Sequence, residues 1–158
     1  MRLTNQKHTV MINAVIDKLH YLIDTIPSKL LSMADETFKL KPETNKWSKQ
    51  EIIGHLIDSA ANNHQRFIRI QYENVPAIFY DQDKWNALNH YQLMDSVHVI
   101  YFWKIYNQHL LEVIKNIPDA NLTKEGNTGG EKNVTLQWLI QDYIEHMEHH
   151  LKQVLNIG

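Results

Sequence analysis

The stretch WSKQEIIGHLIDSAANNHQRFIRIQY, residues 47–72, decides the class of fold, because it carries both the start signal and the period of one long helix. Ser48 is followed three residues later by Glu51, which is the capping-box pattern: the hydroxyl and the carboxylate each satisfy a backbone N–H at the start of a helix. After this box the apolar residues recur at helical rather than strand spacing. We therefore expect a helix from residue 49 to about residue 72.

Three further long helices are predicted from the same kind of period. They span residues 10–26, 90–116 and 136–156, and Thr135 is placed to cap the last of them. Pro27 is expected to end the first helix and to open a short one over residues 28–38, since proline fits the first turn of a helix. In the helix at 90–116, Trp103 is expected to face away from an apolar stripe of Leu93, Val97, Ile100, Tyr101, Ile105, Leu110, Leu111 and Ile114.

Two connections stand out between these helices. The sequence ENVPAIFYDQDKWNAL, residues 73–88, is expected to be a long irregular connection, and residues 121–134 are polar and turn-rich, which is typical of a flexible loop. No convincing alternating strand and no internal repeat is present in the sequence. We predict an all-α protein: a single domain over residues 1–158, folded as a four-helix bundle with a long connection between its second and third helices.

Composition excludes several classes of function. With 16 basic and 18 acidic side chains the net charge is −2, so the chain lacks the cationic excess that binding to nucleic acid requires. It has no cysteine, which excludes disulfides and thiolate ligands, so any metal must be held by nitrogen and oxygen. No segment approaches the roughly 20 apolar residues that span a bilayer. We expect no membrane association and a cytoplasmic location.

Histidines are concentrated near the C-terminus, in EHMEHH at residues 145–150. His146 and His150 are four residues apart, so they lie on one face of a helix at the spacing with which two imidazoles share a metal. His149 is turned aside by about 60° from His146. A zincin motif would need glutamate directly after the first histidine, where Met147 stands. Alone, the pair favours a polar cluster at a helix edge over a metal site, so a third ligand is needed.

The helix at 49–72 offers that third ligand in a polar stripe. Positions seven and eleven residues apart return to within about 20° of one direction, and the stripe so formed is His55, Ser59, Asn62 and Arg66. The stripe is either a solvated face or the wall of a cavity, and its lack of lysine and glutamate favours a cavity. His55 is then a metal ligand or an ordinary hydrogen-bonded histidine.

Some of the other histidines on the predicted helices can be placed relative to His55. His64 lies about 180° from His55, so we interpret it as structural or exposed. His98 and His109 are eleven residues apart and share a face of the helix at 90–116, which leaves them as weaker candidates for a place near the site.

Three segments together, NKWSKQEIIGHLIDSAANNHQRF, YDQDKW and HMEHHLKQV, resemble the DinB-like superfamily of four-helix-bundle proteins, and within it the YfiT-like, bacillithiol-transferase-type branch. The resemblance spans residues 45–154. It implies a divalent metal, nickel or zinc, bound by one histidine of the second helix and two of the last, which are His55, His146 and His150. It also implies transfer of bacillithiol or a related low-molecular-weight thiol to an electrophile, or metal-dependent hydrolysis. Residues 121–134 depart from the pattern of the branch, so the identity of the substrate is not carried over.

The predicted ligand set leaves the reaction open. Three imidazoles leave a divalent ion at least one free position, where a bound water would give hydrolysis and a bound thiol would give S-transfer. We expect Asn62 to orient a water and Arg66 to pair with a carboxylate of the substrate, although Arg66 equally fits a surface salt bridge. The alternatives are a non-catalytic module that holds a metal or small ligand, and a bundle without metal.

The expected partner is a small molecule, and the family resemblance also implies a homodimer. The run VIYFWKIY at residues 99–106 could supply a dimer interface or part of the bundle core.

Overall fold

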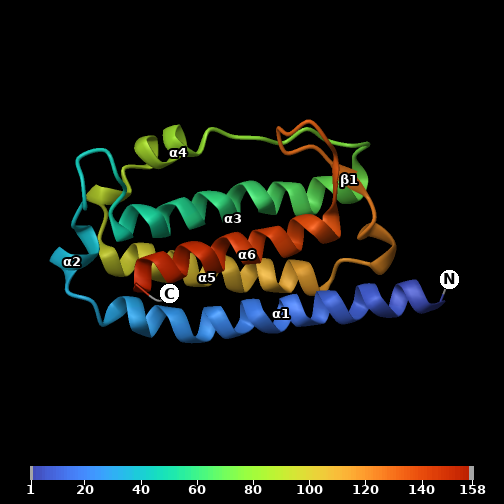
Figure 1. Ribbon diagram of the computed structural model, residues 1–158, viewed down its shortest axis with the longest axis horizontal. Coiled ribbons are helices and arrows are strands. Elements are labelled where there is room, and N and C mark those ends of the chain that lie inside the picture. The colour runs from blue at the N-terminus through green and yellow to red at the C-terminus, as the bar shows by residue number, and fades with distance from the viewer. Residues whose placement is uncertain (1, 157–158) are drawn as a thin grey trace.

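The computed structural model describes the backbone of residues 2–156 and the side chains of residues 11–156. Four long helices lie side by side: α1 (Arg2–Leu31), α3 (Lys49–Tyr72), α5 (Ser96–Lys115) and α6 (Leu136–Leu155) (Figure 1). Helix α3 packs against α5 and α6, and α1 packs against the same two helices. The predicted four-helix bundle is confirmed. The side chain of Val10, the first residue of the predicted helix at 10–26, lies outside the described side chains.

Helix α3 has the boundaries and the cap predicted from its sequence. The Glu51 N–H donates to Ser48 Oγ at 3.1 Å, and the Ser48 N–H donates to Glu51 Oε2 at 2.8 Å. Residues 50–60 are all buried, because this half of the helix is also covered by α2 (Asp35–Lys39), α4 (Gln82–Asn89) and the 3₁₀ turn η1 (Tyr91–Leu93). Polar side chains in this half of α3 therefore lie inside the protein.

The connection at residues 73–88 is more regular than we predicted, since it contains α4. Asp81 caps this helix by accepting from the Lys84 N–H at 3.0 Å. The segment is fixed to α3 by Asn86, whose amide donates to the Glu51 carbonyl at 2.7 Å, and by the ring of Tyr91, which lies on the backbone of Gly54. A Cβ at Gly54 would come within 2.2 Å of the Tyr91 ring, so only glycine permits this approach.

Several predicted helix boundaries are wrong. Helix α1 begins at Arg2 rather than at residue 10. Helix α1 continues through Pro27 to Leu31, and the next helix, α2, begins only at Asp35. Proline removes a single helical hydrogen bond, and the burial of Ile26 and Leu30 on the same face offsets that loss. Helix α5 begins at Ser96 rather than at residue 90, because Asp95 caps it and η1 precedes it.

The predicted apolar stripe of α5 is also wrong in part. Trp103 is fully buried, whereas Leu93 and Ile105 are 84% and 59% exposed, and Val97 and Tyr101 are also exposed. The observed stripe includes a polar member, Asn107, and consists of Val99, Ile100, Trp103, Asn107, Leu110, Leu111 and Ile114.

The segment at residues 121–134 forms a small hairpin after the turn η2 (Asp119–Asn121). Strands β1 (Glu125–Gly126) and β2 (Val134–Thr135) pair antiparallel, with Glu125 opposite Thr135. The hairpin is tied to the connection before α4, since the Ile78 N–H donates to the Asn127 carbonyl at 2.8 Å. Thr135 then caps α6 as predicted, accepting from the Trp138 N–H at 3.2 Å. Across the part of the chain that is described, no helix has the length and apolar character that crossing a membrane requires.

Candidate metal centre

Three histidines from two helices converge near one end of the bundle. The ligand atoms of His55, His146 and His150 all lie within 4.8 Å of one another. His146 Nε2 lies 3.2 Å from His55 Nε2 and 3.1 Å from His150 Nε2. The structure therefore brings together the three residues that the sequence singled out, and each of the three rings directs its Nε2 toward the same point.

The packing of α3 against α6 positions these rings. His55 is 1% exposed and His146 and His150 are half-buried, so the cluster lies just inside the surface. The ring of Trp47, just before the cap of α3, packs on His55 at a centroid distance of 5.1 Å. The three imidazoles meet edge to face, with interplanar angles of 76–78°. The rings are therefore fixed by neighbouring side chains before any ligand binds.

The environment keeps the three imidazoles neutral. Burial, reinforced by the two neighbouring histidines, lowers the pKa of His55 from 6.5 to about 3. Burial and the same kind of neighbours lower the pKa of His146 to about 4, and burial lowers the pKa of His150. A neutral imidazole is the form that binds a metal. At neutral pH the centre therefore needs no deprotonation before it can accept a cation.

The donor set suits a borderline transition metal. Imidazole nitrogen is a good ligand for Zn²⁺, Ni²⁺ and Cu²⁺, whereas Mg²⁺ and Ca²⁺ prefer oxygen. No carboxylate joins the cluster among the described residues. Three nitrogens fit a site that keeps at least one open position for a further ligand.

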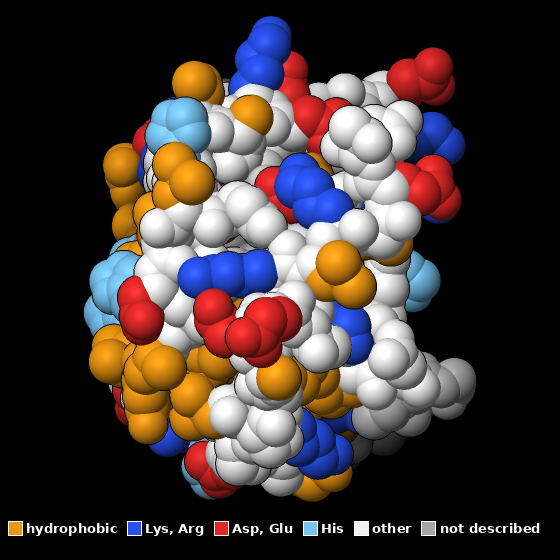
Figure 2. Space-filling model, turned by 90° about the vertical axis from the view of Figure 1, so that its left-hand side faces the viewer, with side chains coloured by type: hydrophobic (Ala, Val, Ile, Leu, Met, Phe, Trp, Pro, Cys, Tyr) orange, Lys and Arg blue, Asp and Glu red, His pale blue; other side chains and the backbone are white. Residues whose placement is uncertain are grey.

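A cavity of about 330 Å³ opens beside the cluster at His150. A second cavity, of about 420 Å³, adjoins it and shares the side chains of Pro42, Trp47, Ile52 and Gln153. The remaining lining of the first cavity is Asn45, Lys46, Gln82 and Asp83. Figure 2 looks onto this end of the bundle, where basic, acidic and apolar side chains are interspersed. A small molecule could reach the histidines through this opening.

Two side chains near the histidines were missed by the sequence reasoning. Gln153 lies three residues after His150, and its Oε1 is 3.2 Å from His150 Nδ1. Asp58 lies three residues after His55 and is 1% exposed. Both could have been identified from the sequence, because a polar residue three positions after a ligand histidine lies on the same face of the helix.

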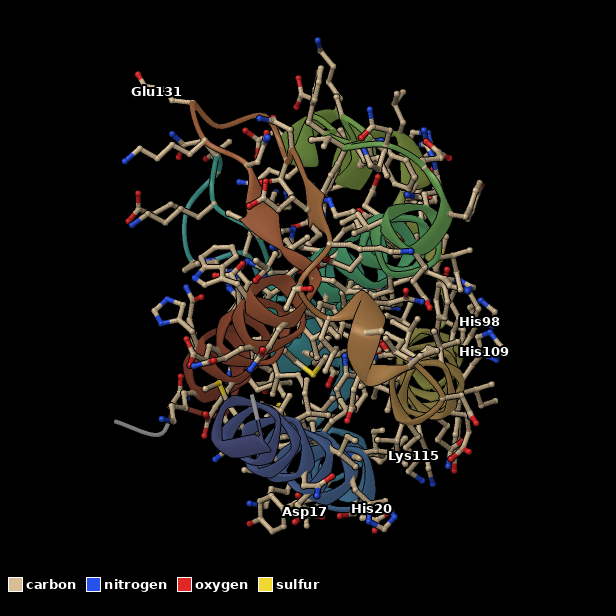
Figure 3. All side chains as sticks on the ribbon, turned by 90° about the vertical axis from the view of Figure 1, so that its right-hand side faces the viewer. Asp17, His20, His98, His109, Lys115 and Glu131 are labelled. Atoms are coloured by element: carbon tan, nitrogen blue, oxygen red, sulfur yellow. The ribbon has the colours of Figure 1, made fainter. Side chains whose placement is uncertain are left out.

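The other candidate histidines lie elsewhere. His149 is exposed, and its ring touches that of His150 at a centroid distance of 5.4 Å. His64 packs against Tyr106 and His109, between α3 and α5. His98 and His109 are exposed on the outer side of α5 (Figure 3). None of these four joins the cluster of three ligand atoms in the described structure.

The two predicted catalytic residues are bound to the scaffold. The Arg66 guanidinium donates to the Ile78 carbonyl at 2.9 and 3.0 Å, so it holds the connection before α4, and no salt bridge of Arg66 is found among the described residues. The Asn62 amide donates to the Asp58 carbonyl at 2.9 Å. At about 1.5 Å of helix per residue, Asn62 lies roughly 10 Å and Arg66 roughly 16 Å along α3 from His55. These interactions favour a role in holding the fold, and a catalytic role for either residue stays a prediction.

Fold and site together define a class: a helical bundle with an all-imidazole candidate metal centre on two facing helices. A comparison with known protein families shows which family this chain belongs to. The chain matches the DinB superfamily over residues 17–154, and it belongs to that superfamily.

The relatives of this chain agree with that assignment. YfiT of Bacillus subtilis (strain 168) is 22% identical over 149 residues, covering 90% of this chain and 83% of YfiT. A protein of Bacillus mycoides (strain KBAB4) is 22% identical over 148 residues, covering 90% of this chain and 85% of its own. Both are named provisionally as metal-dependent hydrolases.

A solved structure of YfiT shares the fold. It superposes with a TM-score of 0.83 at 19% identity, covering 92% of this chain and 85% of that one. Its authors describe a probable metal-dependent hydrolase with an unusual four-helix-bundle topology.

Proposed function

We propose that this protein is a metal-dependent transferase that joins a low-molecular-weight thiol, of the bacillithiol type, to an electrophilic substrate. The observation that carries the proposal is the cluster of His55, His146 and His150 at the mouth of a cavity. A zinc or nickel ion at these nitrogens would supply the positive charge that lowers the pKa of a thiol or a water beside it.

The lining of the cavity favours a thiol over water as the nucleophile. Asp83 is its one carboxylate among the described lining residues, and it is exposed on α4. Hydrolysis usually needs a positioned general base to take a proton from water. A thiol needs less help than water, because its free pKa is about 8.5 against about 15.7 for water, and coordination to a cation deprotonates it outright.

The proposed step needs no further reactant. The thiol sulfur forms a bond to the electrophilic carbon, and the leaving group departs with the electron pair of the bond that breaks. The thiol proton passes to solvent through the open cavity. Trp47 and Ile52 contribute apolar surface against which the carbon skeleton of a substrate can lie.

An assay with the metal-loaded protein tests this. Zinc- and nickel-loaded protein is incubated with bacillithiol and related thiols and with a chromogenic aryl halide. We expect a rate that depends on the thiol, that disappears in His55→Ala and that persists in His149→Ala, the matched control for an adjacent exposed histidine. If no thiol gives a rate above that of His55→Ala, the proposed reaction is wrong.

Hydrolysis is the second candidate, because both relatives carry the name of a metal-dependent hydrolase. It uses the same three histidines with water as nucleophile. Release of a chromophore from esters or amides without thiol, abolished in His55→Ala, would favour it. Stoichiometric metal binding with neither activity would favour a non-catalytic binding module.

We also propose a cytoplasmic homodimer. Exposed apolar side chains on the outer side of α5 support an interface between two copies, and they are Val97, Tyr101, Phe102 and Ile105. Light scattering after size exclusion should give twice the 18.7 kDa chain mass, and Phe102→Lys should return it to one. A single chain mass for the unmodified protein contradicts the dimer.

A further inference from the structure

Two buried polar atoms on α3 have no hydrogen-bond partner among the described residues: His55 Nδ1 and Asp58 Oδ2. One is a ring nitrogen that can donate and the other is a carboxylate oxygen that can accept. Both side chains are 1% exposed, so bulk water does not satisfy these atoms. Leaving a buried polar atom unpaired is costly, and such atoms in a folded protein call for an explanation.

The two atoms belong to residues that are neighbours on the helix. A spacing of three residues places the His55 and Asp58 side chains on adjoining positions of one face, one turn apart. His55 directs Nε2 at the other two histidines, which leaves Nδ1 for a partner outside the cluster. Asp58 uses only Oδ1 elsewhere, accepting from the Tyr91 hydroxyl at 2.6 Å and from the Asn89 amide at 2.9 Å.

We propose that Asp58 is a positioning residue of the metal centre, its Oδ2 accepting the Nδ1 proton of His55, directly or through one buried water, when a divalent cation is bound at the three Nε2 atoms. This inference rests on the metal-dependent function proposed above. Histidines that bind metals commonly donate their second ring N–H to a carboxylate or carbonyl, which fixes the tautomer and the ring orientation. For His150, the side-chain oxygen of Gln153 already lies beside Nδ1. For the buried His55, Nδ1 has no hydrogen-bond partner among the described residues.

The electrostatics of Asp58 support this role. Burial raises the pKa of its carboxyl from 3.8 to about 6, because the charged form is poorly solvated. A cation bound at Nε2 of His55 would stabilise that charge, and the Nδ1 proton would give Oδ2 the donor it lacks. Through Tyr91 and Asn89 the same carboxylate holds η1 and the end of α4, so one side chain would join a metal ligand to the segment that leads to the cavity.

Asp58→Asn tests the proposal with two readouts. The asparagine keeps one oxygen for Tyr91 and Asn89, but it places an amide N–H₂ where Oδ2 stood, and that group cannot accept from His55. We expect a 10–100-fold loss of Zn²⁺ affinity by competition with a chromogenic chelator. We expect the melting temperature of the metal-free protein to stay equal or to rise, because a buried charge has been removed. A residue that acted only in packing would lower the melting temperature of the metal-free protein as well, so a loss of Zn²⁺ affinity without a loss of metal-free stability separates the two roles.

Tyr91→Phe is the matched control, since it removes a partner of Oδ1 and leaves Oδ2 untouched. It should lower the melting temperature while Zn²⁺ affinity stays within about threefold. Unchanged Zn²⁺ affinity in Asp58→Asn, or a fall in both affinity and metal-free stability, overturns the role of Asp58.

A measurement on the unmodified protein covers the case in which Asp58→Asn does not fold. NMR of the zinc-loaded chain should show the His55 Nδ1 proton downfield and in slow exchange with water. If that proton exchanges too fast to be seen, the proposal is wrong. If the unmodified protein binds no metal, the metal-dependent function fails as well, whereas metal binding that is indifferent to Asp58 removes this inference alone.

Discussion

Lowering the pH from 7 to 5 should destabilise the metal-free protein, because two histidines of the cluster, the buried His55 and the half-buried His146, resist protonation in the folded state. The pKa of His55 falls from 6.5 to about 3 and that of His146 to about 4 on folding. The unfolded chain therefore binds more protons than the folded chain below pH 6.5, so the stability present above that pH is lost as the pH falls toward the folded values.

The size of this loss depends little on the folded pKa values, since both lie below pH 5. At pH 5 a histidine that stays neutral when folded and is protonated when unfolded costs about 2 kcal/mol. The expected loss of stability at pH 5 is therefore about 2 kcal/mol for His55. It is about 1 to 2 kcal/mol for His146, which is half-buried and partly screened by solvent.

Asp58 acts in the opposite direction, since its folded pKa is raised to about 6. Its folded form takes up a proton as the pH falls through 6, which returns about 1 kcal/mol by pH 5. The net expected loss from these three groups is about 2 to 3 kcal/mol.

Urea unfolding at pH 7 and pH 5, in the presence of a chelator, measures this loss in the free energy of unfolding. The pH-dependent loss should be about 2 kcal/mol smaller in His55→Leu than in the unmodified protein, because leucine does not titrate. Other carboxylates titrate equally in both proteins and cancel in the difference. His20→Gln, at an exposed histidine of α1, should lose as much stability as the unmodified protein. An equal loss in His55→Leu and the unmodified protein would refute the reasoning.

Three further predictions concern metal binding and helix α3. Zinc at 100 times its dissociation constant should stabilise the fold by about 2.7 kcal/mol and raise the melting temperature by roughly 5–10 °C. Adding a chelator should reverse this shift. If the shift persists in His146→Ala, the metal binds elsewhere. Ser48→Ala removes a buried cap and should cost about 1–2 kcal/mol in urea unfolding, a loss that stability within 0.5 kcal/mol of the parent would contradict. Gly54→Ala would place a methyl group against Tyr91 and should cost about 1–3 kcal/mol, most of it recovered in a Gly54→Ala/Tyr91→Ala double variant measured against Tyr91→Ala.

Features that depend on local interactions were predicted correctly. The capping box at Ser48 and Glu51 and the cap at Thr135 involve residues within one turn of each other, so their sequence spacing is sufficient. The pairing of His146 with His150 is equally local. His55 required more, because only the polar stripe of α3 indicated an inward face.

Features that depend on tertiary contacts were not predicted correctly. The stripe on α5 was misassigned because Asn107, polar in sequence, is buried where it accepts from the Tyr143 hydroxyl at 2.6 Å. Helix α4 is short, and its burial against α3 through Asn86 is invisible in its own sequence. Continuation of α1 through Pro27 likewise reflects what its last turn packs against. In each case a contact with a distant residue outweighed the local pattern.

The ligands of the candidate centre are 91 positions apart in the chain, from His55 to His146. A polypeptide emerging from the ribosome therefore presents no three-histidine site until α6, the last helix, has been synthesised and has docked against α3. In the unfolded chain, joining these positions around a cation would carry the entropy cost of closing a long loop, whereas in the folded bundle the packing of α6 against α3 already holds them together. Zinc or nickel would therefore bind only after α6 has docked against α3, and metal loading would report that this contact has formed.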